Sequence, residues 1–153
     1  AQKRVKWYAG RWRIEVYHRT LKSGCRIKNR QLGTANSLQA CLGVDMVVAW
    51  RIYHLTMLGR ATPDVDCTVF FSNVEWKALC CYVTKKPTPP EKPPSLKEAI
   101  LMVAKIGGFL GRNQDGPPGT TVLWRGLQRL DTASEMYSIV RGEESTPPPE
   151  AWP

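Results

Sequence analysis

The chain has 153 residues, of which 42% are apolar, which is enough for one domain, alone or with an appendage, around a hydrophobic core. Residues 1–30 hold ten Lys or Arg against the single carboxylate of Glu15, so the whole net charge of +9 lies in this segment. A local excess of positive charge indicates an anionic partner, either nucleic acid or an anionic membrane surface. The five cysteines show no C-x-x-C spacing, and both histidines lie far in sequence from any Cys pair, which argues against a zinc site or a disulfide framework and favours a reducing cytosol.

Residues 7–22 are predicted to form a helix with two stripes. The apolar stripe, which can face a core, consists of Trp7, Gly10, Ile14, Tyr17 and Leu21. The polar stripe consists of Tyr8, Arg11, Glu15, His18, Arg19 and Lys22. A polar face with an i,i+4 ion pair is usually solvated, but this one is too cationic to neutralise itself and carries a phenol. It also suits phosphate binding around one carboxylate.

A basic connection and a long apolar helix follow. Residues 25–33 form a basic connection with Arg26, Lys28 and Arg30, which is either a solvated loop or an extension of a phosphate track. Residues 34–60 are the longest predicted helix, capped by Thr34 or Asn36 and apolar almost all round, as expected of a buried core helix. Charged residues within 38–58 make it too polar for a membrane span, so we expect no membrane partner.

Shorter elements follow. Asp64 and Asp66 are interpreted as part of a turn rather than as metal ligands. Residues 72–75 and 95–98 are capping-box patterns that open two short helices. Between them, residues 85–94 contain five prolines and are predicted to be an extended linker. The last helix, from Thr121 to about Val140, carries one apolar face made by Leu123, Leu127, Leu130 and Tyr137.

These elements predict an all-α chain with about five helices. We expect a helical part with the polar stripe over residues 1–86, a Pro-rich linker over 87–94, a helical C-terminal region over 95–142 and a disordered Pro-rich tail over 143–153. The chain begins without Met and goes almost directly into the polar stripe, so we expect it to be a piece of a longer protein.

A specific spacing stands out in the first helix. Tyr8, Arg11, Glu15 and Lys22 fit the pattern Tyr-x2-Arg-x3-Glu-x6-Lys, and this pattern resembles the signature of the insertion-sequence-four family of bacterial DDE transposases. Trp12, His18 and nearby residues are also similar to that family, as are residues 30–32 and 107–110. The resemblance covers most of the chain as the C-terminal part of such an enzyme.

The resemblance implies a site and a reaction. Such enzymes hold two divalent ions, Mg²⁺ or Mn²⁺, with three carboxylates on an RNase H-like fold and use them for phosphoryl transfer on DNA. It implies that Glu15 is the third catalytic acid and a metal ligand, and that Tyr8, Arg11 and Lys22 bind DNA phosphates, with Arg19 as a further phosphate contact. The two Asp residues of the family pattern precede this motif and are absent here.

The same resemblance implies transposon-end DNA as a partner, a homodimer in the complete enzyme, and a location in the bacterial cytoplasm at the nucleoid. The fragment alone is expected to be inactive and to bind no metal ion tightly, because one carboxylate does not fix two hard cations. Two other classes remain open. One is a non-catalytic basic helical module that binds nucleic acid, and the other is a dimerisation domain in which the basic segment only aids solubility.

Overall fold

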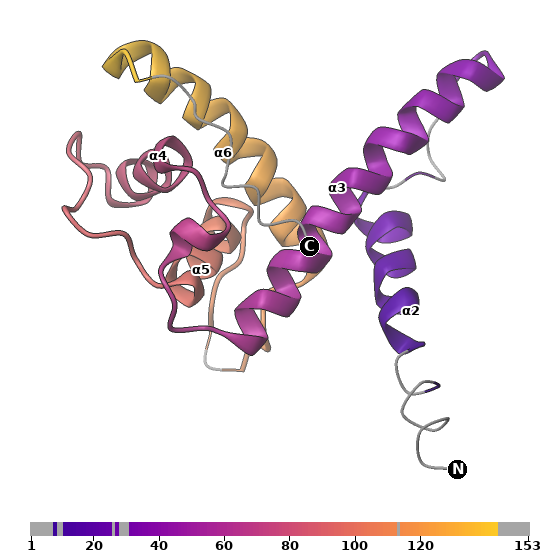
Figure 1. Ribbon diagram of the computed structural model, residues 1–153, viewed down its shortest axis with the longest axis horizontal. Helices are drawn as coiled ribbons and strands as arrows, with labels where there is room; N and C mark the ends of the chain where they lie inside the picture. Colours follow the sequence, from indigo (N-terminus) through magenta and orange to yellow (C-terminus); the bar gives the residue numbers. More distant parts are fainter. Residues whose placement is uncertain (1–7, 9–10, 26, 28–30, 113, 144–153) are drawn as a thin grey trace. The chain divides into compact units, whose positions relative to one another are not determined.

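The computed structural model describes residues 8, 11–25, 27, 31–112 and 114–143, and within these ranges it is all-α (Figure 1). Five α-helices are present in the described residues: α2 (Trp12–Arg19), α3 (Ala35–Ala61), α4 (Asn73–Thr84), α5 (Leu96–Ile106) and α6 (Thr120–Arg141). A π-helical turn follows α2 at Thr20–Gly24, and a 3-10 turn lies at Cys67–Val69. The predicted fold class is therefore confirmed.

The chain divides into two compact units, residues 1–54 and residues 55–153. The division falls within α3, whereas the sequence suggested a boundary at the Pro-rich segment. In the second unit, α4 precedes that segment and α5 and α6 follow it, yet the three helices pack on one another. Residues 87–94 thus connect neighbouring helices of one unit, and residues 95–142 are not a separate appendage.

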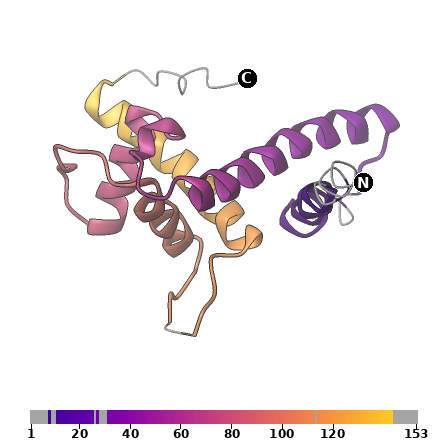
Figure 2. The same cartoon turned by 60° about the horizontal axis from the view of Figure 1, so that its bottom comes forward.

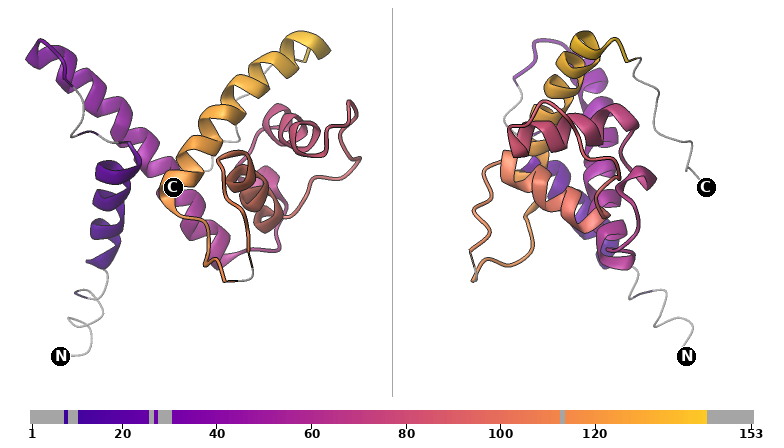
Figure 3. Two further views of the ribbon diagram at one scale, coloured as in Figure 1. Left: turned by 180° about the vertical axis from the view of Figure 1, so that it is seen from behind. Right: turned by 90° about the vertical axis from the view of Figure 1, so that its left-hand side faces the viewer.

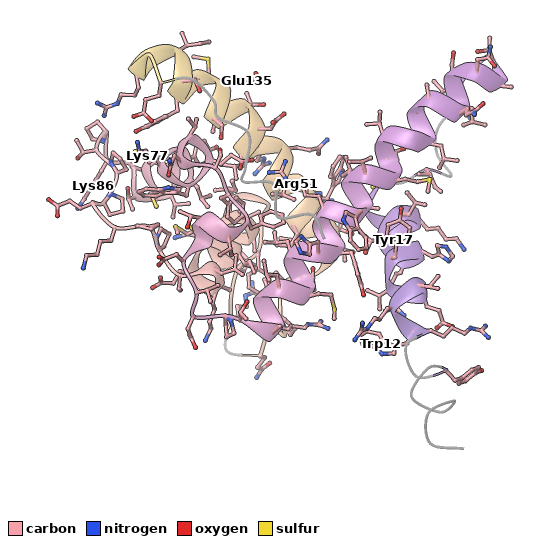
Figure 4. All side chains as sticks on the ribbon, in the orientation of Figure 1. Trp12, Tyr17, Arg51, Lys77, Lys86 and Glu135 are labelled. Atoms are coloured by element: carbon pink, nitrogen blue, oxygen red, sulfur yellow. The ribbon has the colours of Figure 1, made fainter. Side chains whose placement is uncertain are left out.

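In the first unit, α2 is held against α3 by a small apolar cluster. Leu21, Cys25 and Ala49 are its buried members, and Tyr17, Ile27 and Val48 pack around them. The Tyr17 side chain is labelled on α2 in Figure 4. Its hydroxyl donates a hydrogen bond to the Met46 carbonyl oxygen at 3.0 Å, and burial raises the pKa of this phenol. This cluster fixes which side of α2 faces outward.

The end of the first helix differs from the prediction of one α-helix through Lys22. The α-helix stops at Arg19, and Thr20–Gly24 continues as a π-helical turn. Thr20 is fully buried, and its hydroxyl donates to the Val16 carbonyl oxygen at 3.0 Å. Because a π-helix needs more residues per turn than an α-helix, this turn changes the direction in which Lys22 projects.

The apolar stripe of α2 is only partly buried. Tyr17 and Leu21 contact α3 in the cluster, but Ile14 is 57% exposed. Trp7 and Gly10, which were also assigned to this stripe, lie outside the described residues, as do Arg26, Lys28 and Arg30 of the predicted phosphate track.

The α3 helix begins where the sequence predicted, because the Thr34 hydroxyl accepts a hydrogen bond from the Ser37 backbone N–H at 3.2 Å. The prediction of a helix buried on all sides was wrong for its first half. Leu38, Leu42, Met46 and Trp50 are exposed and recur every four residues, so they form one ridge along the helix. The amino-acid composition predicts the apolar content of α3, but it does not predict which faces of the helix are covered by other parts of the protein.

By length and composition α3 is apolar enough to cross a membrane, in contrast to the expectation from its charged residues. Core helices of soluble proteins have the same properties, so this finding gives only weak support to a membrane location.

In the second unit, α4 and α5 both begin with the predicted capping boxes. Ser72 and Glu75 exchange side-chain and backbone hydrogen bonds at the start of α4, and Ser95 and Glu98 do so at the start of α5. Asp66, part of the predicted turn, forms an isolated bridge with Ser95. These contacts set where each helix enters the core.

The core of the second unit lies where α4, α5 and α6 meet, as Figure 2 and Figure 3 show from further directions. Fully buried side chains from the three helices include Leu79, Leu96, Val103, Leu123 and Leu130. The crossing of α5 and α6 is very close, because a Cβ on Gly126 would lie 2.1 Å from the Val103 carbonyl oxygen. Glycine is therefore required at this position.

Candidate functional site

The polar stripe of α2 is on the surface, as the sequence predicted. Arg11 Nε lies 4.0 Å from Glu15 Oε1, and the two side chains are 65% and 67% exposed. The Arg11 guanidinium also lies 5.7 Å from the centre of the Tyr8 ring, and Tyr8 is 71% exposed. Tyr8, Arg11 and Glu15 thus follow one another along one open face.

The remaining members of the stripe, His18, Arg19 and Lys22, are exposed as well. Arg19 ends α2, and Lys22 lies on the π-helical turn. Since Tyr17 and Leu21 anchor the opposite side of this segment to α3, these cations cannot turn inward without breaking the apolar cluster. The stripe is a fixed, solvent-facing row of cations around one carboxylate.

This arrangement suits anion binding better than metal binding. Arg presents a planar fork of donors that matches two phosphate oxygens, and Lys adds a mobile point charge. Mg²⁺ and Mn²⁺ need several oxygen ligands, whereas the near neighbour of Glu15 is the cation of Arg11. Within the described residues, no group of three or more His, Cys, Asp or Glu side chains is placed to hold a metal ion. Glu15 can supply one ligand, but the described residues do not fit a complete metal site.

A second surface feature lies in the other unit. A groove of about 1190 Å³ runs between α4 and α6, with the Pro87 segment at its edge; we call it the α4–α6 groove. Its wall is mostly apolar and includes Tyr82, Ala133 and Met136, while Arg125 and Arg129 add positive charge. Among the described residues that line it, none is acidic.

Several polar contacts hold the walls of the groove together. Lys77 of α4, labelled in Figure 4, forms an ion pair with Glu143 just after α6, with Lys77 Nζ 2.9 Å from Glu143 Oε2. The Pro87 carbonyl oxygen accepts hydrogen bonds from Arg141 and from the Cys81 thiol. The Arg129 guanidinium donates to the Ile106 carbonyl oxygen at the end of α5. The groove is therefore a defined feature of the folded unit.

The predicted apolar face of α6 packs in the core of the second unit. Leu123, Leu127 and Leu130 are buried against the other helices, and Tyr137 is half-buried with its pKa raised by burial. A different side of α6 remains uncovered near its C-terminal end, where Met136, Ile139 and Val140 are 56%, 75% and 76% exposed. Exposed apolar residues concentrated in this way are typical of interaction surfaces.

A comparison with known protein families finds a match that covers most of this second unit. A family model described as the transposase Tn5 dimerisation domain matches residues 47–146. The chain belongs to this family. The matched region contains all of α4, α5 and α6, and it supports assignment of the chain to the C-terminal region of a transposase and a role in homo-oligomerisation. The polar stripe on α2 precedes the matched region.

Sequence reasoning found the polar stripe of this Tn5-type chain but not its groove. The stripe follows from helical spacing alone, whereas the groove depends on how α4 and α6 pack. One signal was present in the sequence, because Met136, Ile139 and Val140 lie off the predicted Leu face of the last helix. Apolar residues outside the core-facing stripe indicate a second contact surface.

Proposed function

We propose that this chain is the C-terminal part of a DDE transposase of the insertion-sequence-four type, which acts on transposon-end DNA in the bacterial cytoplasm. In this proposal α2 contributes the third catalytic acid, Glu15, and a row of phosphate contacts, while the second unit joins two copies. Cut-and-paste transposition by two-metal phosphoryl transfer is the reaction of the complete enzyme.

One observation carries the proposal. The four residues of the Tyr-x2-Arg-x3-Glu-x6-Lys pattern, Tyr8, Arg11, Glu15 and Lys22, are all exposed on the α2 segment, with Arg11 beside both Tyr8 and Glu15. This exposure leaves all four side chains accessible to a DNA backbone. The family match to a transposase dimerisation domain supports the same assignment independently.

The proposed roles of the side chains follow from their chemistry. Arg11, Arg19 and Lys22 bind backbone phosphates, and the Tyr8 hydroxyl can donate one further hydrogen bond to a phosphate oxygen. Glu15 supplies one oxygen ligand to Mg²⁺ or Mn²⁺, which would activate the attacking and leaving oxygens when bound. In the family pattern that the motif resembles, the other ligands are two Asp residues that precede the motif.

Salt dependence of DNA binding tests the phosphate contacts. Each contact with a phosphate releases counterions, so Arg11→Ala, Arg19→Ala or Lys22→Ala should reduce the slope of log K against log salt by about one unit. The loss should be similar for different DNA sequences. Fluorescence anisotropy of a labelled duplex across a salt series measures this slope.

Lys105→Ala is the matched control, because Lys105 is an exposed helical cation in the other unit. It removes the same charge without touching the polar stripe, so its slope should stay at the wild-type value. Equal losses in Lys105→Ala and in the three stripe variants would mean that DNA responds to net charge and not to α2.

A second candidate function is a dimerisation domain that makes no contact with DNA. The family match favours it in one respect, because the matched residues 47–146 exclude α2. In that case the polar stripe is only a solvated face. Binding of a duplex at near-physiological salt that is weakened by Arg11→Ala separates the two functions.

A further inference from the structure

We propose that the α4–α6 groove binds the acidic, proline-rich tail of its own chain, residues 144–153, which runs back along α6 from Glu143. This inference goes beyond the proposed function, since it involves neither DNA nor the polar stripe. The tail lies outside the described residues. Its place follows from the groove, from the residue that precedes the tail and from the tail sequence.

Glu143, the last residue before the tail, directs the chain toward the groove. Gly142 ends α6 in the left-handed conformation, with φ at 64°, so the chain leaves the helix axis at this point. Glu143 then pairs with Lys77 of α4. Burial and, after it, the charge of Glu143 raise the pKa of Tyr137, which lines the groove. The tail therefore begins beside α4, on the side of α6 where the groove lies.

The tail is long enough to follow the whole groove. The lining residues on α6 extend from Arg125 to Arg141, which at 1.5 Å per residue is about 24 Å. A proline-rich chain in the polyproline II conformation advances about 3.1 Å per residue. On that rise Trp152 reaches about 28 Å from Glu143. The tail thus spans the groove without stretching.

The charges of the tail complement those of the groove. The tail carries two carboxylates, Glu144 and Glu150, and no basic residue. The charged residues among the described lining are all arginines: Arg125, Arg129 and Arg141. At about 22 Å from Glu143, Glu150 comes level with the two arginines at the far end of the groove. Opposite charges that meet in this way fix the direction in which the tail lies.

The prolines of the tail suit the apolar wall. Residues 147–149 are all proline, and the same rise places them near the middle of the groove. Two lining side chains, Tyr82 and Met136, are 43% and 56% exposed. Aromatic-lined grooves bind proline-rich segments because such segments are already extended and lose little conformational entropy on binding. The tail would thus cover apolar surface that otherwise faces water.

Covalent attachment favours the tail over any free ligand. The tail is joined to the end of α6, which forms one wall of the groove. A short linker of this kind gives an effective concentration in the millimolar range, on the order of 1 mM or more. Weak contacts are therefore sufficient to fill the groove from within the same chain. A free peptide or a second copy must displace the tail before it enters.

Disulfide formation within one chain tests the docking. In the full chain with Cys41→Ser and Cys81→Ser, the remaining native cysteines are at most 5% exposed. Pro148→Cys in the tail is combined with Thr132→Cys, a lining position at about the same distance from the end of α6. Oxidation in a glutathione buffer should link these two cysteines within one chain. Non-reducing electrophoresis separates linked monomers from linked dimers, and peptide mass spectrometry identifies the linked pair.

Asp131→Cys combined with Pro148→Cys is the matched control. Asp131 is exposed and adjacent to Thr132, but it projects about 100° around the helix from it and is not among the described residues that line the groove. A tail without a docking site would link to both positions at similar rates. The groove pair should form at least about tenfold faster. Equal rates would overturn the proposal, and so would linkage mainly between two chains, which would assign the groove to the tail of another copy.

A charge exchange tests the register of the tail. Arg125→Glu or Glu150→Arg alone should slow the link between the groove and tail cysteines at least about threefold, because like charges then meet. The two exchanges together restore opposite charges and should return the rate to its original value. A double exchange that stays as slow as the single ones would overturn the proposed direction of the tail.

A measurement without introduced cysteines uses a fluorescently labelled synthetic peptide of residues 144–153. The full chain with Glu150→Arg and Trp152→Ser has a weakened tail, because it has lost one carboxylate and the only aromatic side chain of that segment. The peptide should bind this variant at least about tenfold more tightly than the wild type, whose own tail competes. Fluorescence anisotropy measures both affinities. Equal affinities, or no binding to either protein, would overturn the proposal.

Discussion

Arg11 has the central position in the polar stripe, because it lies beside both the ring of Tyr8 and the carboxylate of Glu15. Such an open ion pair contributes little to stability, because water and salt screen it. A phosphate can therefore compete for Arg11 at small cost to the fold. Exposure to solvent thus makes the stripe accessible to a ligand and also limits its contribution to the stability of the fold.

At the level of single residues, the sequence was sufficient to identify which stripe members are exposed. Spacings of three and four place Tyr8, Arg11 and Glu15 on one face, and no tertiary contact overrides that pattern. The exposure of Ile14 was not predictable, since an apolar residue is buried only if a partner lies opposite it. The metal and phosphate roles of the stripe remain predictions.

Thiol reactivity should follow burial. Cys67 is fully buried, and burial raises its pKa to about 12, so almost no thiolate forms near neutral pH. Cys41 and Cys81 are partly exposed. We expect N-ethylmaleimide at pH 7 to label Cys41 and Cys81 before Cys67, as read by peptide mass spectrometry at increasing times. Labelling of Cys67 as fast as Cys41 would contradict the packing of the second unit.

At the level of elements, local signals predicted the helix starts well. The Ser72 and Ser95 caps use hydrogen bonds within three residues, so they depend on the sequence alone. The π-helical turn after α2 and the ridge on α3 were missed because both depend on contacts between distant residues, and the same is true of the groove. Composition alone also suggested a linker where the structure has a connection between packed helices.

The crossing of α5 and α6 makes the second unit sensitive to a single methyl group. In Gly126→Ala the new Cβ would lie 2.1 Å from the Val103 backbone oxygen, so the helices must separate. We expect the free energy of unfolding to fall by about 1–3 kcal/mol, which is typical of overpacking. Urea denaturation followed by circular dichroism measures the change.

Gly116→Ala is the control for this substitution. Nothing lies within 4 Å of a Cβ at Gly116, so the free energy of unfolding should change by no more than about 0.5 kcal/mol. If the two variants were equally stable, the close approach of α5 and α6 would not describe the folded protein.

At the level of the whole molecule, the two units carry different parts of the proposed function. Residues 1–54 present the polar stripe, and residues 55–153 form the compact unit that contains most of the family match and the α4–α6 groove. The sequence predicted both an all-α chain and a C-terminal dimerisation region. It did not place the division within α3, because that helix shows no Pro or composition change at the boundary.

The identity of Glu15 as a catalytic acid is the central claim, and its substitution by Gln is the most direct test. Without metal, the negative charge of Glu15 repels the phosphates that Arg11 and Lys22 attract. Glu15→Gln keeps the shape of the side chain and removes that charge, so a labelled duplex should bind this variant as tightly as the wild type or more tightly. Arg11→Ala should bind more weakly under the same conditions.

Fluorescence anisotropy at a fixed low salt concentration, without divalent ions, measures both variants against the wild type. Glu15→Gln should bind the duplex with the same affinity as the wild type or a higher one, and Arg11→Ala should bind it with a lower affinity. A loss of affinity in Glu15→Gln while Arg11→Ala and Lys22→Ala bind normally would mean that the stripe only stabilises the helix. That result would contradict the assignment of α2 to a transposase active site.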